Sequence, residues 1–118
     1  MGKEYLYLNS RDELLRMDIN NIVFFEGEGS YTHIVSANNL KSVLSINLSK
    51  LQLILNEKLK SNSTIFARIG KKYIINLNHI YSINIASQHL ILSDGLTFVY
   101  KLNVSRDALK KLKKLYQQ

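Results

Sequence analysis

The sequence predicts an all-β or β-rich fold, built from several small antiparallel sheets with one or two short amphipathic helices. Short apolar runs rich in β-branched and aromatic residues alternate with turn residues along most of the chain. Helical periodicity occurs in only two segments, and proline is absent. A chain of 118 residues with 46% apolar and 21% charged residues has the size and composition of one globular domain. We therefore expect residues 1–118 to form a single domain.

Strand-like runs occupy most of the first 46 residues and are separated by short polar turns. Gly, Asn and Asp dominate these turns, in DINN (18–21), GEGS (27–30) and ANN (37–39). The runs cover residues 5–8, 13–17, 22–26, 31–36 and 40–46. Their length and residue types are typical of strands.

The segment NLSKLQLILNEKLK, residues 47–60, predicts an amphipathic helix packed on a sheet. Either Asn47 or Ser49 can serve as its N-cap, because both side chains accept hydrogen bonds from the first helical N–H groups. Its apolar stripe recurs at helical spacing and consists of Leu48, Leu51, Leu55 and Leu59.

Five more strand-like runs follow, at residues 65–69, 72–76, 81–86, 89–93 and 96–102. The turn SDG at 93–95 predicts a hairpin, because Gly95 tolerates positive φ and the Asp94 carboxylate can accept a local hydrogen bond. The last segment, 105–118, predicts a second amphipathic helix with Ser105 as N-cap and Asp107 in the first turn. Its apolar stripe is Leu109, Leu112 and Leu115, with Lys110, Lys111, Lys113 and Lys114 around it.

Charge is distributed unevenly along the chain. Residues 1–40 carry three basic and six acidic side chains, whereas residues 41–118 carry thirteen basic and three acidic ones. A polarised basic domain with a formal net charge of +7 fits a polyanionic partner such as nucleic acid. A solvated surface that only maintains solubility would have the same composition.

Several kinds of site find no support in the sequence. The absence of cysteine excludes disulfides and thiolate metal sites and fits a reducing compartment, so a cytoplasmic protein is expected. The three histidines are far apart, so neither a metal site nor another cofactor is expected. No apolar run approaches the length of a membrane-spanning helix, and MGKEYL does not resemble a signal peptide, so no membrane partner is expected.

Catalysis is also not expected. The acidic residues gather in the first 28 positions without a partner pattern for acid–base chemistry, and no serine stands in a G-x-S-x-G motif. The Gly-rich GEGS connects two strands, so it lacks the helix N-terminus of a phosphate-binding loop.

Three clusters at turns or strand ends carry polar side chains that could bind a partner. Lysine and arginine reach phosphates and the acceptor atoms of guanine in the major groove. The first cluster comprises Ser30, Tyr31, Thr32 and His33, the second Gly70, Lys71 and Lys72, and the third Lys101, Asn103, Ser105 and Arg106.

Each cluster also has a purely structural interpretation. Tyr31, Thr32 and His33 are good strand residues, and a single histidine is more often structural than functional. Lys71 and Lys72 would serve equally as a charged hairpin tip, although no acidic residue lies near them in the sequence. Arg106 could belong to the first helical turn and pair with Asp107.

Taken together, the segments resemble the LytTR-type DNA-binding domain of bacterial response regulators, over nearly the whole chain. DINNIVFFEGEGSYTHIV and LSINLSKLQLIL resemble the first signature of the family and its helix. FARIGKKYIINLNHI is similar to the most specific signature, "F.RiHrSyiVNl..I", with Gly70 and Lys72 in place of its histidine and serine. HLILSDGLTFVYKLNVSR resembles the closing hairpin, which ends in "SR".

The resemblance implies an elongated domain whose loops enter successive major grooves of double-stranded DNA, as in a two-component transcription regulator. By position, Thr32 or His33, Lys71 and Arg106 would read bases or line the groove. Lys72, Lys101 and Asn103 would contact phosphates, and Arg68 and Asn76 would tie strands and turns together. The usual receiver domain is missing from these 118 residues, so we expect either an isolated effector domain or a stand-alone regulator.

The expected partner is thus double-stranded DNA, with tandem or repeated half-sites and a homodimer on the DNA. The alternative is a β-rich interaction module whose basic face binds an acidic protein or an anionic membrane. A third possibility, single-stranded nucleic acid or RNA, would require exposed stacking aromatics, for which Tyr31, Tyr73 and Tyr100 are the candidates.

Overall fold

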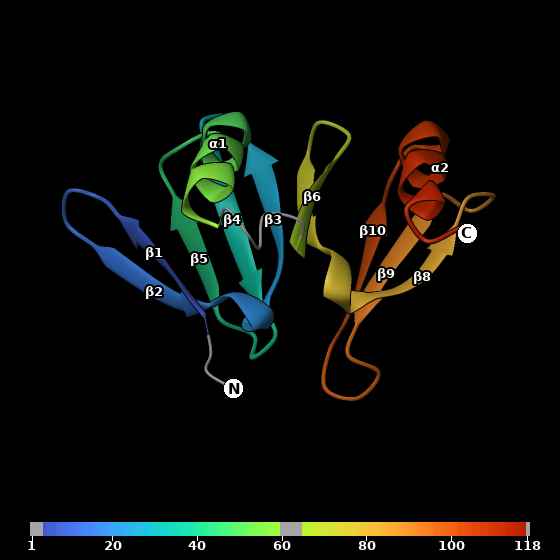
Figure 1. Cartoon of the computed structure of the whole chain (residues 1–118), viewed down its shortest axis with the longest axis horizontal. Coiled ribbons are helices and arrows are strands. Elements are labelled where there is room, and N and C mark those ends of the chain that lie inside the picture. The colour runs from blue at the N-terminus through green and yellow to red at the C-terminus, as the bar shows by residue number, and fades with distance from the viewer. Residues whose placement is uncertain (1–3, 60–64, 118) are drawn as a thin grey trace.

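A computed structural model describes residues 4–59 and 65–117, which form three antiparallel sheets and two α-helices (Figure 1). Strands β1 (Tyr5–Asn9) and β2 (Leu14–Asp18) form a hairpin. The central sheet has the order β5-β4-β3-β7-β6, and the third sheet has the order β10-β9-β8. The bounds of the central strands are β3 Ile22–Glu28, β4 Tyr31–Ser36, β5 Lys41–Leu44, β6 Phe66–Ile69 and β7 Tyr73–Asn76. The remaining elements are α1 Leu48–Lys58, β8 Ile80–Asn84, β9 His89–Ser93, β10 Val99–Asn103 and α2 Arg106–Lys114.

The central sheet is covered on both faces. One face packs against α1 and β1, through a core that includes Leu6, Phe25, Ile34, Leu51 and Ile74. The other face packs against the three-stranded sheet and α2, through a core that includes Phe24, Ile75, Leu90, Leu92 and Leu109. Burial on both faces explains why β3 begins IVFF and β7 reads YIIN, with no polar alternation until Asn76.

Strand β3 contains an irregularity that affects which of the two cores each of its side chains faces. Its register with β4 shifts between Ile22 and Phe24, as in a β-bulge, where an extra residue is accommodated in one strand. Val23 and Phe24 consequently face the same core, while Ile22 and Phe25 face the other.

The buried Asn76 connects the end of β7 to β3. Its amide group donates to the carbonyl oxygens of Ile22 at 2.9 Å and Ile19 at 3.4 Å, and its side-chain oxygen accepts from the backbone N–H of Asn78 at 2.9 Å. Both ends of the side chain are thus satisfied inside the protein. The expectation that Asn76 has a structural role is confirmed.

Both helices begin where the sequence predicts. Asn47 caps α1, with its side chain accepting from the N–H of Lys50, and Ser105 caps α2 in the same way through Ala108. The four predicted stripe leucines of α1 are buried. In α2, Leu109 and Leu112 are buried, but Leu115 is 62% exposed because the helix has ended at Lys114.

The predicted strand 96–102 is wrong at its start. The Asp94 carboxylate accepts hydrogen bonds from the N–H groups of Leu96, Thr97 and Phe98, and from the Thr97 hydroxyl. These bonds hold 94–98 as a broad turn, so that β10 starts only at Val99. The Thr97 hydroxyl bond, with the three backbone bonds, also keeps the pKa of Asp94 below its usual range. Gly95 has φ +79°, which confirms the predicted left-handed position in this turn.

Other element ends differ by a few residues. The predicted strand 40–46 narrows to β5, and 81–86 shifts to β8 at 80–84. The predicted last residues of the two helices, Lys60 and Gln118, lie outside the described residues. Residues 1–3 also lie outside them. The domain is elongated, with extents of 44 × 36 × 27 Å, and neither α1 nor α2 has the length and apolar character needed to cross a bilayer.

Candidate nucleic-acid interface

Three turns lie along one edge of the molecule, at the top of Figure 1. We define the loop edge as residues 29–31, 70–72 and 104–106. A hollow of about 370 Å³ is lined by Gly29 from the first turn, Lys71 from the second and Asn47 at the start of α1. Another, of about 510 Å³, is lined by Gly70 and Ser105, which joins the second turn to the third. The fold therefore brings together three turns that lie far apart in sequence.

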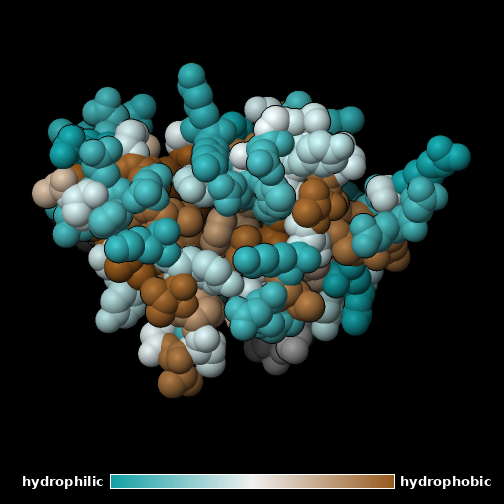
Figure 2. Space-filling view, turned by 180° about the vertical axis from the view of Figure 1, so that it is seen from behind, coloured by the Kyte–Doolittle hydropathy of each residue, from teal (hydrophilic) through white to brown (hydrophobic). Residues whose placement is uncertain are grey.

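Mostly hydrophilic side chains cover this edge when the molecule is seen from behind (Figure 2). Hydrophobic side chains appear chiefly in the middle and lower parts of that view. The edge therefore has the polar character of a surface exposed to solvent.

The turn between β6 and β7 is held rigidly by Arg68. The Arg68 guanidinium donates to Ser49 Oγ at 3.3 Å and Gln52 Oε1 at 3.0 Å on α1, and to the Lys71 carbonyl oxygen at 2.9 Å. Gly70 has φ +59°, a conformation that glycine adopts without steric cost. The expectation of a structural role for Arg68 is confirmed, because it fixes the turn against the first turns of α1.

The two lysines of this turn have different surroundings. Lys71 is exposed and has no ion-pair partner among the residues described. Lys72 Nζ lies 3.1 Å from Glu26 Oε2 on β3, and the hydrogen bond to this carboxylate raises the pKa of Lys72. No acidic residue is close to the two lysines in the sequence. In the fold, Lys72 pairs with Glu26, which is far from it in the sequence but lies on β3, the strand next to β7.

Tyr31 and His33 are accessible at the start of β4, but Thr32 is not. Thr32 is fully buried, and its hydroxyl donates to the Ile46 carbonyl oxygen at 2.9 Å, so it tethers the segment after β5. Tyr31 is 51% exposed. His33 Nε2 lies 2.7 Å from Glu28 Oε1.

The third cluster is divided between two surfaces. Lys101 and Asn103 are exposed on the face of β10 opposite Leu102, which belongs to the core, so they lie on the outer face of the three-stranded sheet. Arg106 begins α2 at the loop edge, and its guanidinium donates to the Ala86 carbonyl oxygen at 3.2 Å rather than pairing with Asp107.

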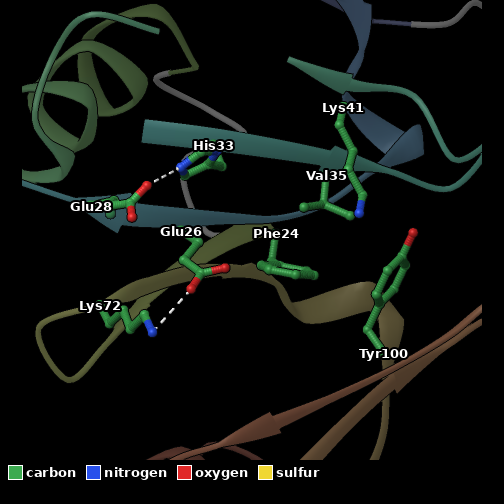
Figure 3. Close-up of a pocket in the computed structure, with 9 residues that line it drawn as sticks. Phe24, Glu26, Glu28, His33, Val35, Lys41, Lys72 and Tyr100 are labelled. Carbon is green, nitrogen blue, oxygen red and sulfur yellow. Dashed lines mark hydrogen bonds and ion pairs between the residues drawn. The ribbon is translucent and has the colours of Figure 1, made fainter. Parts of the chain in front are cut away.

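A hollow of about 310 Å³ lies beside the loop edge, between β3, β4, β10 and the turn that carries Lys72 (Figure 3). Phe24, Val35 and Tyr100 supply apolar surface to it, and Lys41 lies at the same end as Tyr100. The Glu26–Lys72 ion pair and the Glu28–His33 hydrogen bond line the other end. Glu26 lines this hollow, although none of the three clusters predicted from the sequence contains it.

Two comparisons place this geometry among known proteins. A family model described as the LytTr DNA-binding domain matches residues 12–117. A solved structure described as the LytTr DNA-binding domain of a methyl-accepting/DNA response regulator from Bacillus cereus superimposes with a TM-score of 0.65 at 19% sequence identity. The superposition covers 99% of this chain and 100% of that one. A search of curated proteins found no match.

The structural match agrees with the small antiparallel sheets and two helices expected from the sequence, which confirms the fold class. The family match spans both the turn with Lys71 and the start of α2. The chain belongs to the LytTR family of DNA-binding domains, which act in transcription regulation.

Proposed function

We propose that this domain recognises a specific sequence in double-stranded DNA as a bacterial transcription regulator, with residues 1–118 acting as one unit and the loop edge facing the duplex. The observation that supports it is the gathering of three turns, with exposed Lys71 and Arg106, along one edge of a basic domain. Turns that project from a rigid sheet can enter a major groove, where donors meet the acceptor atoms of guanine.

The structure supports a division of roles among the candidate residues. Lys71 and Arg106 read bases, because both side chains are exposed at the loop edge and neither has a carboxylate partner among the described residues. Tyr31 and His33 line the groove beside them. Thr32 is left out, because its hydroxyl is already bonded inside the protein.

The phosphate contacts come from Lys72, Lys101 and Asn103. Phosphate contacts position a protein on the duplex and supply sequence-independent affinity. Lys101 and Asn103 lie on the outer face of the third sheet, so they reach the backbone beyond the part of the duplex that Arg106 contacts.

Two copies of the domain bind tandem half-sites on one face of the duplex, as a homodimer on DNA. Centres about 10–10.5 bp apart place the two copies one helical turn from each other. The spacing of the recovered motif tests this arrangement directly.

The main experiment is enrichment of binding sites from a pool of random duplex DNA at near-physiological salt. Specific recognition yields one motif, repeated at about one helical turn. Retained DNA without an enriched motif would contradict it. Tight binding to anionic vesicles with weak, salt-insensitive DNA binding would instead favour the interaction module.

On the recovered site, Lys71→Ala should weaken binding, and Arg106→Ala should cost about 1–3 kcal/mol and relax the preference at one base position. The matched control is Arg11→Ala, which removes the same charge from an exposed position between β1 and β2, away from the loop edge. Competition binding on the site and on single-base variants measures both effects. An Arg106→Ala protein with the affinity and preference of the wild type would remove that base contact.

A further inference from the structure

Lys72 is bound by the protein's own carboxylate in the surface proposed to face DNA. Its ammonium lies 3.1 Å from Glu26 Oε2, and its side chain extends along β3 toward this carboxylate (Figure 3). The side chains of Lys72 and Glu26 are 59% and 32% exposed, so the pair is open to solvent and to exchange of partners. Lys71, its neighbour in the same turn, has no such pair among the described residues.

The backbone fixes the two halves of this pair relative to each other. Glu26 is opposite Tyr73 in the β3–β7 ladder, and the N–H of Gly27 donates to the carbonyl oxygen of Lys72 at 2.8 Å. Only the side chain of Lys72 is therefore free to move between Glu26 and a phosphate. The raised pKa of Lys72 agrees with an ammonium stabilised by this carboxylate.

A carboxylate and a DNA phosphate compete for the same ammonium. When Lys72 turns to a phosphate, Glu26 loses its partner and lies near the negative duplex. This cost is repaid only where the fit of the loop edge brings the phosphate close to Lys72. On DNA of arbitrary sequence the lysine stays with Glu26.

We propose that Glu26 competes with DNA phosphates for Lys72 and so attenuates DNA binding: the lysine stays with the carboxylate on non-cognate DNA and leaves it on the cognate site, where the cost of separating the pair lowers the affinity. This inference rests on the proposed function. It assigns to Glu26 the suppression of one sequence-independent phosphate contact on non-cognate DNA and a general weakening of DNA affinity.

The test is Glu26→Gln, which keeps the shape of the side chain and removes its charge. The matched control is Glu13→Gln, which removes the same net charge from an exposed position between β1 and β2 and leaves the Glu26–Lys72 pair and the Glu28–His33 contact intact. Affinity is measured for the enriched site and for a random-sequence duplex of equal length, between 50 and 300 mM KCl at pH 7.5.

Glu26→Gln should raise affinity for the random duplex about three- to tenfold and steepen its plot of log K against log salt by about 0.9, as expected for one additional phosphate contact. On the enriched site the affinity should rise at least as much, because the cost of separating Lys72 from Glu26 is gone. The salt slope there should stay as in the wild type, because Lys72 already contacts a phosphate on that site. Glu13→Gln should change both affinities by the same factor and leave both salt slopes unchanged, because it alters only net charge.

A double variant, Glu26→Gln with Lys72→Gln, identifies the source of the gain. It should lose the added affinity and the added slope, because the released lysine is gone. Equal slopes for Glu26→Gln and wild type on random DNA would overturn the proposal, as would a gain that persists in the double variant. Thermal unfolding of each variant shows that the fold is intact.

Failure of this inference can be distinguished from failure of the proposed function. If the wild type enriches no motif, specific recognition itself is wrong. If it enriches a motif and Glu26→Gln leaves the salt slope on random DNA unchanged, recognition stands and the role of Glu26 does not.

Discussion

At the scale of single residues, the interior of this domain depends on one polar side chain. Asn76 is completely buried in the central sheet, yet both its donor and its acceptor are used, by β3 and by the 3₁₀ turn Leu77–His79. Its removal takes this partner from the buried carbonyl group of Ile22 and from the partly buried N–H group of Asn78.

We therefore expect Asn76→Ala to lower the free energy of unfolding by about 2–3 kcal/mol, the cost of leaving buried polar groups unsatisfied. Asn78→Ala is the control, because Asn78 is exposed and contributes its backbone N–H to the same network. Urea unfolding followed by circular dichroism measures both. A loss below about 0.5 kcal/mol for Asn76→Ala, the range of ordinary surface substitutions, would contradict this role.

Single residues also show where inference from the sequence ends. Alternation along the strand YTHIVS already separates Thr32 from Tyr31 and His33, so the burial of Thr32 could have been predicted. The pairing of Lys72 with Glu26 could not, because it depends on β3 lying beside β7, which no local pattern encodes. The structural roles of Arg68 and Asn76 came from the family resemblance rather than from residue chemistry.

At the scale of elements, local sequence signals predicted whether a segment is a helix or a strand better than they predicted the residues at which it ends. Caps at Asn47 and Ser105 predicted where both helices begin, because capping depends on neighbouring residues alone. The start of β10 was misplaced, because Leu96, Thr97 and Phe98 have strand-forming side chains while Asp94 binds their N–H groups. Side-chain bonds of this kind compete with the sheet for backbone donors.

The β6–β7 turn gives the prediction at this scale. Gly70→Val places a β-branched residue at φ +59°, so stability should fall by about 1–2 kcal/mol even though no atom would clash with the new Cβ. Because the same turn carries Lys71, affinity for the enriched site should fall together with stability.

Gly70→Asn is the comparison, since asparagine tolerates this conformation better than other side chains do. It should retain most of the stability and most of the binding. Equal stability of the valine and asparagine variants would show that the turn adopts another conformation in solution. Chemical denaturation and competition binding provide the two measurements.

At the scale of the whole molecule, charge and shape act together. The basic excess lies in residues 41–118, which contribute the turn with Lys71, the outer face of β10 and all of α2. The first forty residues are acidic on balance, although β3 and β4 lie in the central sheet. Attraction to a duplex is thus concentrated on part of an elongated body, which orients the domain as it approaches.

With about four phosphates neutralised, affinity for any duplex should fall about 10²-fold between 50 and 200 mM KCl. Fluorescence anisotropy with a labelled duplex measures this dependence. A slope of log K against log salt near zero would contradict an electrostatic interface.

The position of β7 in the central sheet has a consequence for how the chain is made. β3 is hydrogen-bonded to β4 on one side, and its other neighbour, β7, lies beyond α1 in the sequence. During synthesis, β3 therefore emerges with one edge open until β7 follows. Because β3 contains the apolar run IVFF and its backbone groups on this edge are unpaired, an incomplete chain would pair with another chain here. Contacts of this long sequence separation also slow folding, so the edge stays open longest in the nascent protein.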